Sequence, residues 1–536
     1  MSKEQKPART LAGIAGIVAA ATLISKLVAL VRQQAIASAF GIGDAANAYN
    51  YAYVIPGVLL VLFGGVNGPI HSAIVSVLEK RQKHEAAPLV ETVTTLVSGV
   101  LLVLTIGLFF FADFFISLVG PGLSANAHAI ATQQLQIMAP MALLAGLIGI
   151  GFGTLNSANQ YWLLSISPIF SSITIIIGLG LLYLQIGNKI VSPQYALLGG
   201  VVLAWGTLAG AIWQWLVQLI VQWRLGLGSL RLRFNFRTPA VQEVIKIMAP
   251  ATFSSGMMQI NVYTDLFFAS IIPGAAAAFN YANLLVQTPL GIISNVILLP
   301  LLPTLSRLSE PSEWANLKLR IRQGLLLTAI TMLPLGALTI ALALPIVRIV
   351  YERGAFNRSA TQLVVSVLMA YGVGMFVYLA RDVLVRVFYA LGDGTTPFRV
   401  SIINIFLNAV LDYFLVKPFG APGLILATVS VNISSTIMLL WLLNRKLNGL
   451  PLREWAWLIL GLTGSSFIAG AASWFSYFGL QQLWSSSHLL ALLVQLTISG
   501  LIGIGIFAAI AAKMKLPEFE LVGARLTQFG KRLARR

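Results

Sequence analysis

The residues of this chain that could take part in chemistry are ionisable side chains inside long apolar stretches. A charge at the centre of a bilayer costs about 3 kcal/mol or more, so such a residue usually faces a water-filled cavity or a partner. These residues fall in the first apolar segment and in several later ones: Lys26, Arg32, Asp265, Arg381, Asp382, Arg386 and Asp412. The sequence therefore predicts a membrane protein with a polar route through it.

A second group of residues carries oxygen atoms in three of the later apolar segments. Asn408 and Asp412 are one helical turn apart and share a face. Asp265 lies in an earlier segment, and Thr428 follows the backbone carbonyl of Leu424 by one turn. Two carboxylates, an amide, a hydroxyl and a carbonyl suit a hard cation. The alternative is that the two carboxylates are protonated or bonded to neighbouring helices.

The composition excludes several classes of protein. Of 536 residues, 57% are hydrophobic and only 10% are charged, a balance that is typical of transmembrane helices. Cysteine is absent, which excludes disulfides, thiol catalysis and cysteine-ligated metals. The chain has no GxxxxGK[ST] loop, so it does not hydrolyse ATP by that route. Transport would have to use an ion gradient, the membrane potential or the substrate gradient.

The pattern of apolar segments predicts an all-α polytopic fold with about fourteen transmembrane helices. Segments that begin GVVLA (200–204) and GLILA (423–427) suggest two pseudo-repeated lobes of six helices, although chance similarity is the alternative. The expected parts are an N-terminal lobe of helices 1–6 (1–223), a C-terminal lobe of helices 7–12 (224–446), helices 13–14 (447–512) and a basic cytoplasmic tail (513–536).

The positive charges are distributed as membrane topology requires. Most Lys and Arg residues outside the apolar segments lie in the two tails and in every second loop, which predicts that both termini are cytoplasmic. The net charge of +18 is therefore mainly a topology signal, and we do not expect nucleic-acid binding. The basic tail should also contact anionic membrane lipids.

Four motifs resemble one family. They are SKLVALVRQQAIASAFG (25–41), LLPLLPTLSR (298–307), YERGAF (351–356) and RVFYALGDGTTP (386–397). Together they closely resemble the MurJ/MviN family, the lipid II flippases of the MOP exporter superfamily. The resemblance covers almost the whole chain. It implies two lobes around a central cavity, and turnover of a lipid-linked peptidoglycan precursor from the cytoplasmic to the outer leaflet.

The resemblance gives the cations of the first segment a role. A headgroup with a pyrophosphate cannot cross hydrocarbon unaided, so the protein must offer a wet, cationic cavity. Arginine suits this role because its planar fork binds phosphate bidentately. Arg32 is the main candidate and Lys26 the second. The alternative is that Lys26 pairs with a neighbouring helix and that Arg32 extends to the interface.

The chain departs from the family in its cavity charges. Many relatives have charged residues where this chain has Gln33, Leu60, Val61, Gly65 and a stretch of helix eight that contains Asn283 and Gln287. Uncharged polar residues would then supply hydrogen bonds to the substrate, or they are ordinary contacts between helices. The expected substrate-binding residues are Arg32, Lys26, Ser25, Gln33, Asn47, Asn283 and Gln287.

The resemblance also gives the oxygen-bearing residues a role. In a sodium-coupled member of the family, positions that match Asp265, Asn408, Asp412, Leu424 and Thr428 would bind Na⁺. Elsewhere, Asp382 and Arg386 are spaced as a local ion pair on one helix, which is a structural role. We expect no cofactor other than this Na⁺ ion and no catalytic residue.

With this resemblance, the sequence predicts a multi-pass lipid II flippase of the bacterial inner membrane that works by alternating access, coupled to an ion gradient or the membrane potential, and not an enzyme. Alternatives are a flippase for another polyprenyl-pyrophosphate glycan, a cation-coupled drug antiporter and a non-transporting membrane scaffold. The expected partners are lipid II or a similar lipid-linked glycan, membrane lipids and enzymes of cell-wall synthesis.

Overall fold

A computed structural model describes residues 11–65, 68–158, 160–484 and 488–519 of the chain. Within these ranges the secondary structure is helical, and no strand occurs. The all-α fold class predicted from the apolar segments is therefore confirmed.

The described residues contain twelve helices that are long and apolar enough to cross a membrane. The pair α6 (Ala125–Met138) and α7 (Met141–Ser157), which is bent by 43°, makes a thirteenth if it is one span. The apolar stretch that follows α10 (Ala196–Arg224) is divided between α11 (Pro239–Met258) and α12 (Ile260–Ala269). Pro250, inside α11, removes one backbone hydrogen bond from this stretch.

Contacts divide the chain into two compact units, and the first comprises residues 1–277 and 353–356. In this unit α2 packs against α6 and α7, α10 packs against α6, α7 and α9, and α1 packs against α8 and α9. Besides α11 and α12, the α-helices of this unit are α1 (Leu11–Phe40), α2 (Asp44–Gly64), α3 (Pro69–Leu78), α4 (Lys83–Phe110), α5 (Ala112–Val119), α6 (Ala125–Met138), α7 (Met141–Ser157), α8 (Tyr161–Ile166), α9 (Pro168–Ile186) and α10 (Ala196–Arg224).

One core of the first unit explains why α11 belongs to it. Ile70 and Ile74 of α3, Val90 of α4 and Val244 of α11 are fully buried in a single hydrophobic cluster. Burying such side chains contributes about 1.5–3 kcal/mol each. By packing, the first unit therefore extends through α11 and α12, beyond the lobe boundary expected at residue 223. The repeat of two six-helix lobes stays a prediction.

Helices of the first unit approach one another closely at a glycine. A Cβ atom on Gly149 of α7 would lie 1.7 Å from the carbonyl oxygen of Phe63 on α2. Only a residue without a side chain allows this contact, as is common between membrane helices.

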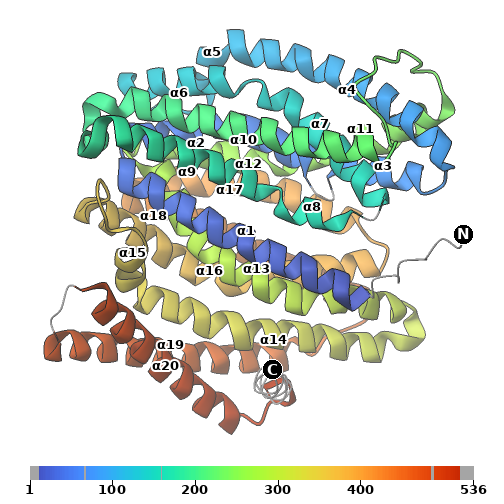
Figure 1. Cartoon of the computed structure of the whole chain (residues 1–536). Coiled ribbons are helices and arrows are strands. Elements are labelled where there is room, and N and C mark those ends of the chain that lie inside the picture. The colour runs from blue at the N-terminus through green and yellow to red at the C-terminus, as the bar shows by residue number, and fades with distance from the viewer. Residues whose placement is uncertain (1–10, 66–67, 159, 485–487, 520–536) are drawn as a thin grey trace, which may run out of the picture. The chain divides into compact units, whose positions relative to one another are not determined.

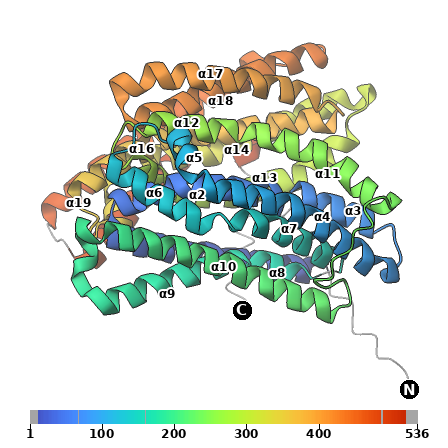
Figure 2. The ribbon, with the colours of Figure 1, turned by 90° about the horizontal axis from the view of Figure 1, so that it is seen from above.

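The second unit comprises residues 278–352 and 357–536. In it α14 packs against α16 and α19, and α18 packs against both α16 and α17. Helices α17 and α18 lie side by side in Figure 2. The helices are α13 (Ala275–Arg307, which starts in the first unit), α14 (Trp314–Ala341), α15 (Ala343–Tyr351), α16 (Arg358–Ala390), α17 (Thr395–Phe419), α18 (Ala421–Lys446), α19 (Leu452–Leu483) and α20 (Leu489–Lys513).

The last two helices are integral to this unit. Ala329 of α14, Leu462 of α19 and Phe507 of α20 are buried in one cluster, and α19 and α20 run together in Figure 1. Beyond α20, the buried carboxylate of Glu518 accepts a 2.9 Å hydrogen bond from Arg322. The chain after α20 is thus fixed to α14 as far as this residue. The rest of the expected basic tail, from residue 520, lies outside the described residues.

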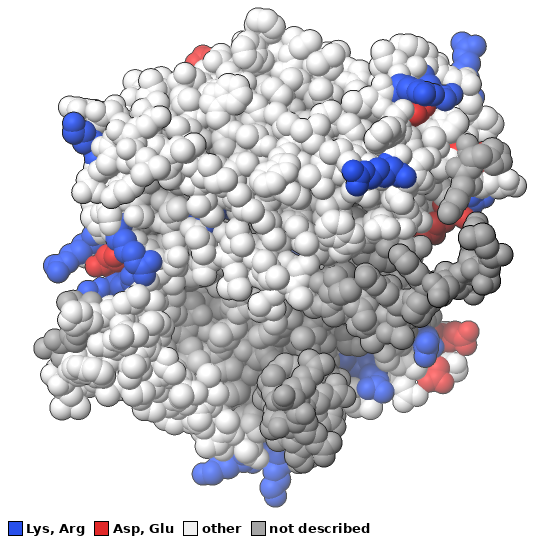
Figure 3. Space-filling view, viewed as in Figure 1, with Lys and Arg blue, Asp and Glu red and all other residues white. Residues whose placement is uncertain are grey.

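The surface of the spans is apolar. Figure 3 shows a face with broad uncharged areas, where Lys and Arg gather at the margins. Large apolar side chains such as Leu184 and Phe475 are exposed. Helices that satisfy their own backbone and expose such side chains suit a hydrocarbon environment.

Candidate functional site

Arg32 lies on α1 with an unused donor. Its side chain is half-buried, and its Nε atom is buried without a hydrogen-bond partner among the described residues. It interacts electrostatically with Tyr49 and Tyr53 of α2, whose rings stack 5.6 Å apart. Burying a guanidinium N–H without a hydrogen-bond acceptor costs free energy. This arrangement therefore favours an acceptor from a bound ligand.

The other predicted residues of α1 have different surroundings. Lys26 is half-buried, and Gln33 is buried. The Ser25 hydroxyl is buried 2.9 Å from both the Ala21 carbonyl and the Ser165 carbonyl of α8. Ser25 therefore joins α1 to α8, and its single proton already has acceptors.

The predicted amides are divided between the units. In the first unit, Asn47 of α2 is buried, and its Oδ1 atom accepts a 3.4 Å hydrogen bond from the backbone N–H of Ala277. In the second unit, Asn283 and Gln287 lie one turn apart on α13, where Asn283 is half-buried and Gln287 is exposed. The contact of Asn47 is thus of the kind that joins helices, whereas Gln287 is accessible.

Four of the five predicted ion ligands lie on α17 and α18 of the second unit. Asn408 and Asp412 are buried, and the Asn408 amide donates a 2.8 Å hydrogen bond to Asp412 Oδ2. The Thr428 hydroxyl donates a 3.2 Å hydrogen bond to the Leu424 carbonyl. The expected one-turn spacings thus bring these residues into contact in pairs.

The donor chemistry of α17 and α18 fits a sodium ion. Carboxylate, hydroxyl and carbonyl oxygens are ligands of hard cations, and a flip of the Asn408 amide would add its oxygen. Asp265, the fifth predicted ligand, is half-buried on α12 of the first unit. No group of three or more His, Cys, Asp or Glu residues that could hold a metal ion occurs in the described part of the chain. A Na⁺ site here would therefore depend on amide, hydroxyl and backbone oxygens.

The charges of α16 have structural partners. Arg381 donates 3.0 and 3.2 Å hydrogen bonds to the hydroxyls of Ser435 and Ser401, and Arg386 donates a 3.3 Å bond to the Leu298 carbonyl. The prediction of an ion pair between Asp382 and Arg386 is wrong, since these two side chains form no ion pair within the described part of the chain. Arg386 instead donates to a backbone carbonyl of α13. The structural role predicted for this cluster fits these contacts.

The YERGAF motif builds a tight contact with the end of α1. The backbone N–H of Ala355 donates a 2.8 Å hydrogen bond to the Ser38 carbonyl. Gly354 has a φ of +57°, and a Cβ atom there would lie 2.3 Å from the same carbonyl oxygen. Glycine is required at this position for both reasons.

The GDGTTP motif forms a cap at the start of α17. Asp393 accepts hydrogen bonds from the Thr396 N–H at 3.0 Å and from Lys446 Nζ at 2.6 Å. Burial alone would raise the pKa of Asp393, but the hydrogen bonds from Lys446, Thr396 and Thr395 hold this pKa well below its ordinary value. The motif is therefore explained by local structure.

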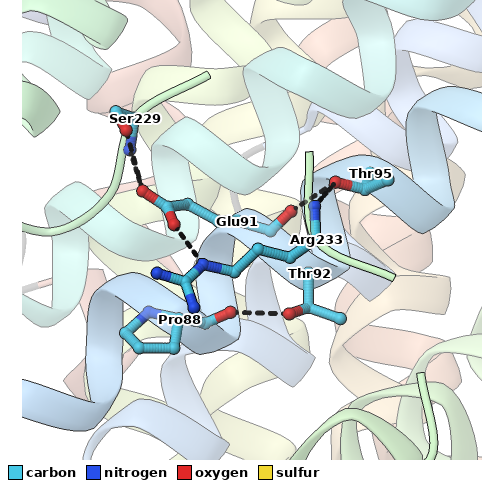
Figure 4. Close-up of polar contacts among 6 residues, drawn as sticks. All are labelled: Pro88, Glu91, Thr92, Thr95, Ser229 and Arg233. Carbon is cyan, nitrogen blue, oxygen red and sulfur yellow. Dashed lines mark hydrogen bonds and ion pairs between the residues drawn. The ribbon is translucent and has the colours of Figure 1, made fainter. Parts of the chain in front are cut away.

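Sequence reasoning missed two polar groups. Tyr49 and Tyr53, beside Arg32, are spaced i,i+4, and this spacing in the sequence indicates that their rings can meet on one helix face. Glu91 of α4 is buried and bonds to Ser229 and Arg233 (Figure 4), and its partners are too distant in sequence to be recognised.

Comparison with known proteins identifies the family. Residues 36–495 match the family model described as lipid II flippase MurJ. The chain is 57% identical over 534 residues to a probable lipid II flippase MurJ of Synechocystis, a match that covers 99% of this chain and 100% of that protein. It is 30% identical to a probable lipid II flippase MurJ of Rhizobium meliloti, covering 77% of this chain and 76% of that protein.

Solved structures agree at the level of fold. A lipid II flippase MurJ in an inward closed conformation matches with a TM-score of 0.75 and 24% identity, covering 93% of this chain and 98% of that one. An inward-facing MATE transporter of the MOP superfamily matches with a TM-score of 0.59 and 15% identity, covering 80% and 97%. The chain belongs to the MurJ family of lipid II flippases and is a multi-pass membrane transporter, not an enzyme.

Proposed function

We propose that this protein flips lipid II from the cytoplasmic to the outer leaflet of the bacterial inner membrane by alternating access. The observation that carries the proposal is Arg32, a half-buried guanidinium with an unused Nε donor on a membrane-spanning helix. The relative from Synechocystis, at 57% identity, is named a probable lipid II flippase.

The role of Arg32 is to hold the pyrophosphate of the headgroup. Its planar fork donates two parallel hydrogen bonds to phosphate oxygens, which are stronger than bonds to neutral acceptors. The adjacent Tyr49 and Tyr53 form an aromatic wall at this cation. Lys26, also half-buried on α1, adds positive charge.

Uncharged polar residues complete the recognition of the headgroup. Gln287 is the most accessible of the predicted amides, and Asn283 lies one turn before it on α13. Gln33 and Asn47 are buried, so they are less accessible to the headgroup than Gln287. Ser25 acts through the position of α1, since its hydroxyl lies between two carbonyls.

Transport is coupled to Na⁺ in this proposal. The ion would be held by Asp412, Asn408, Thr428 and the Leu424 carbonyl. Support comes from the burial of Asn408 and Asp412 and from the all-oxygen donor set. Na⁺ would supply positive charge beside the Asp412 carboxylate and so change the packing of α17 against α18.

The orientation follows from the charge pattern, with both termini in the cytoplasm. In this orientation the basic tail contacts anionic lipids of the cytoplasmic leaflet. Enzymes that make and use lipid II are the expected protein partners.

A complementation experiment tests the proposal. The peptidoglycan flippase of a bacterial host is depleted, this chain is expressed, and lipid II that reaches the outer leaflet is measured. We expect restored lipid II export, which Arg32→Ala lowers strongly and Arg445→Ala leaves intact. Arg445 is a suitable control because its guanidinium lies over the ring of Trp441, 3.9 Å from the ring centroid. Failure of the well-expressed wild-type chain would contradict the proposal and favour another lipid-linked glycan.

A further inference from the structure

The segment between α10 and α11 of the first unit has an unusual surface. Its sequence from Leu230 to Arg237, LRLRFNFR, alternates apolar side chains with arginine or asparagine. Leu230, Leu232 and Phe234 are 58%, 75% and 72% exposed. The segment is not helical, so its own secondary structure does not bury these side chains. Three neighbouring large apolar residues that stay exposed indicate an interaction surface.

A buried carboxylate holds this segment on α4. Glu91 Oε1 accepts hydrogen bonds from the N–H and hydroxyl of Ser229 at 3.0 and 2.8 Å, and Glu91 Oε2 accepts a 2.6 Å bond from Arg233 Nε. The Arg233 N–H donates a 3.0 Å bond to the hydroxyl of Thr95 (Figure 4). The segment is therefore fixed at two points along α4, and the exposed apolar side chains lie around those points.

The attachment sets the depth of the segment in the membrane. Glu91 and Thr95 lie between about two and three turns inside α4, which begins at Lys83. Residues from Glu85 onward belong to a membrane-spanning stretch. Arg233 thus lies beside the first half of this span, toward the end at which the span begins.

The charges near this segment leave a positive excess. The acids there already have basic partners: Glu91 bonds Arg233, and Glu243 lies 3.0 Å from Lys80 and 3.7 Å from Arg81. In contrast, Arg224, Arg231 and Arg237 form no ion pair within the described residues. Free cations beside exposed Leu and Phe side chains match the interface of an anionic bilayer.

We propose that residues 230–237 form a membrane-surface anchor, which inserts Leu230, Leu232 and Phe234 between anionic lipid headgroups while Arg231 and Arg237 bind their phosphates. Glu91 is a positioning residue, because it fixes the segment at headgroup depth without contacting lipid. The anchor binds bulk anionic lipid and is independent of lipid II transport. A chain that fails to flip lipid II can therefore still bind anionic lipid through this anchor.

The absence of cysteine makes a site-specific test direct. Asn235→Cys places a single nitroxide label between the anchor residues and leaves all of them in place. The full-length protein is reconstituted in vesicles of phosphatidylcholine, with or without phosphatidylglycerol. Collision rates of the label with oxygen and with a water-soluble nickel complex then report whether it lies in lipid or in water.

We expect the oxygen-to-nickel ratio to be high only in vesicles that contain phosphatidylglycerol. Each arginine near an anionic surface strengthens binding roughly fivefold, so Arg231→Gln/Arg237→Gln should shift the label strongly toward water. Leu232→Ser/Phe234→Ser should do the same. The matched control Arg445→Gln/Arg453→Gln removes the same charge from the second unit and should change nothing.

Three results would overturn the proposal. One is a label exposed to water in both kinds of vesicle. Another is a label equally buried without phosphatidylglycerol or in the Arg231→Gln/Arg237→Gln variant, because anionic lipid would then not be the partner. The third is a signal that depends on the protein-to-lipid ratio, which would assign the surface to a second copy of the chain.

Discussion

The cation on α1 and the polar cluster on α17 and α18 solve the problem of polar groups in a membrane span in different ways. Arg32 has a buried donor that no described residue accepts. Asn408 and Asp412 are also buried, but they bond to each other at 2.8 Å, and Thr428 bonds to Leu424. Arg32 therefore needs a ligand from outside, whereas Asn408 and Asp412 already bond to each other and would exchange this internal bond for an ion.

The largest effect should follow from removing the cation that lacks a partner. Arg32→Ala loses charge-assisted hydrogen bonds worth about 1.5–3 kcal/mol, so lipid II export should fall by roughly tenfold to a hundredfold. Arg32→Lys keeps the charge without the bidentate fork and should recover part of the export. Lipid II in the outer leaflet is the measurement. Equal export by Arg32→Ala and the control Arg445→Ala would show that Arg32 does not bind the substrate, so that it would not differ in this respect from the α17–α18 cluster.

The next effect should follow from changing the α17–α18 cluster. Asp412→Asn removes the carboxylate that would bind Na⁺, so sodium should no longer stabilise the protein. For the wild type, a concentration of Na⁺ one hundred times its Kd should add about 2.7 kcal/mol. Thermal unfolding in Na⁺ and in K⁺ provides the comparison. If Asp412→Asn kept both the sodium response and transport, the cluster would be purely structural.

The cap at Asp393 offers a test that should affect stability and not transport. Asp393→Ala leaves Lys446 and the Thr396 N–H without their acceptor, which should cost about 1–3 kcal/mol. The pKa of Asp393 is lowered in the folded protein, so its contribution is complete above its unfolded pKa of about 3.9 and is lost as the pH falls further. Unfolding at pH 7 and near pH 3 should therefore show a larger difference between wild type and variant at pH 7. An undiminished difference at low pH would contradict this account.

The smallest effect should come from Ser25. Since its hydroxyl lies 2.9 Å from the Ser165 carbonyl, Ser25→Ala should lower stability by about 1 kcal/mol and leave lipid II export nearly unchanged. Denaturation and export measured on the same preparation separate the two effects. A large loss of export at normal stability would return Ser25 to the substrate site.

The elements that could be predicted from sequence are those set by local patterns. Long apolar stretches predict membrane helices because the hydrocarbon leaves the backbone few alternatives, and the one-turn spacing of Asn408 and Asp412 predicts their contact. The Gly-Asp-Gly-Thr-Thr-Pro turn also acts locally, through Asp393 and Thr396.

Contacts between residues distant in sequence could not be predicted in this way. The contact of the Ser25 hydroxyl with the Ser165 carbonyl could not be seen in the sequence, and the partners of Glu91 lie beyond six intervening α-helices. The apolar pattern of α11 likewise does not indicate that Val244 packs with Ile74 of α3. Apolar spans resemble one another, so their sequences carry little information about which neighbours they choose.

Binding of two ligands to the wild type and to Arg32→Ala tests the role of Arg32 directly. One ligand is a short-chain lipid II, and the other is the same molecule with its pyrophosphate replaced by a neutral linker. If Arg32 holds the phosphate, the variant should lose roughly tenfold or more in affinity for the first ligand and almost nothing for the second. An equal loss for both ligands would contradict the account, because Arg32 would then shape the cavity without binding the phosphate.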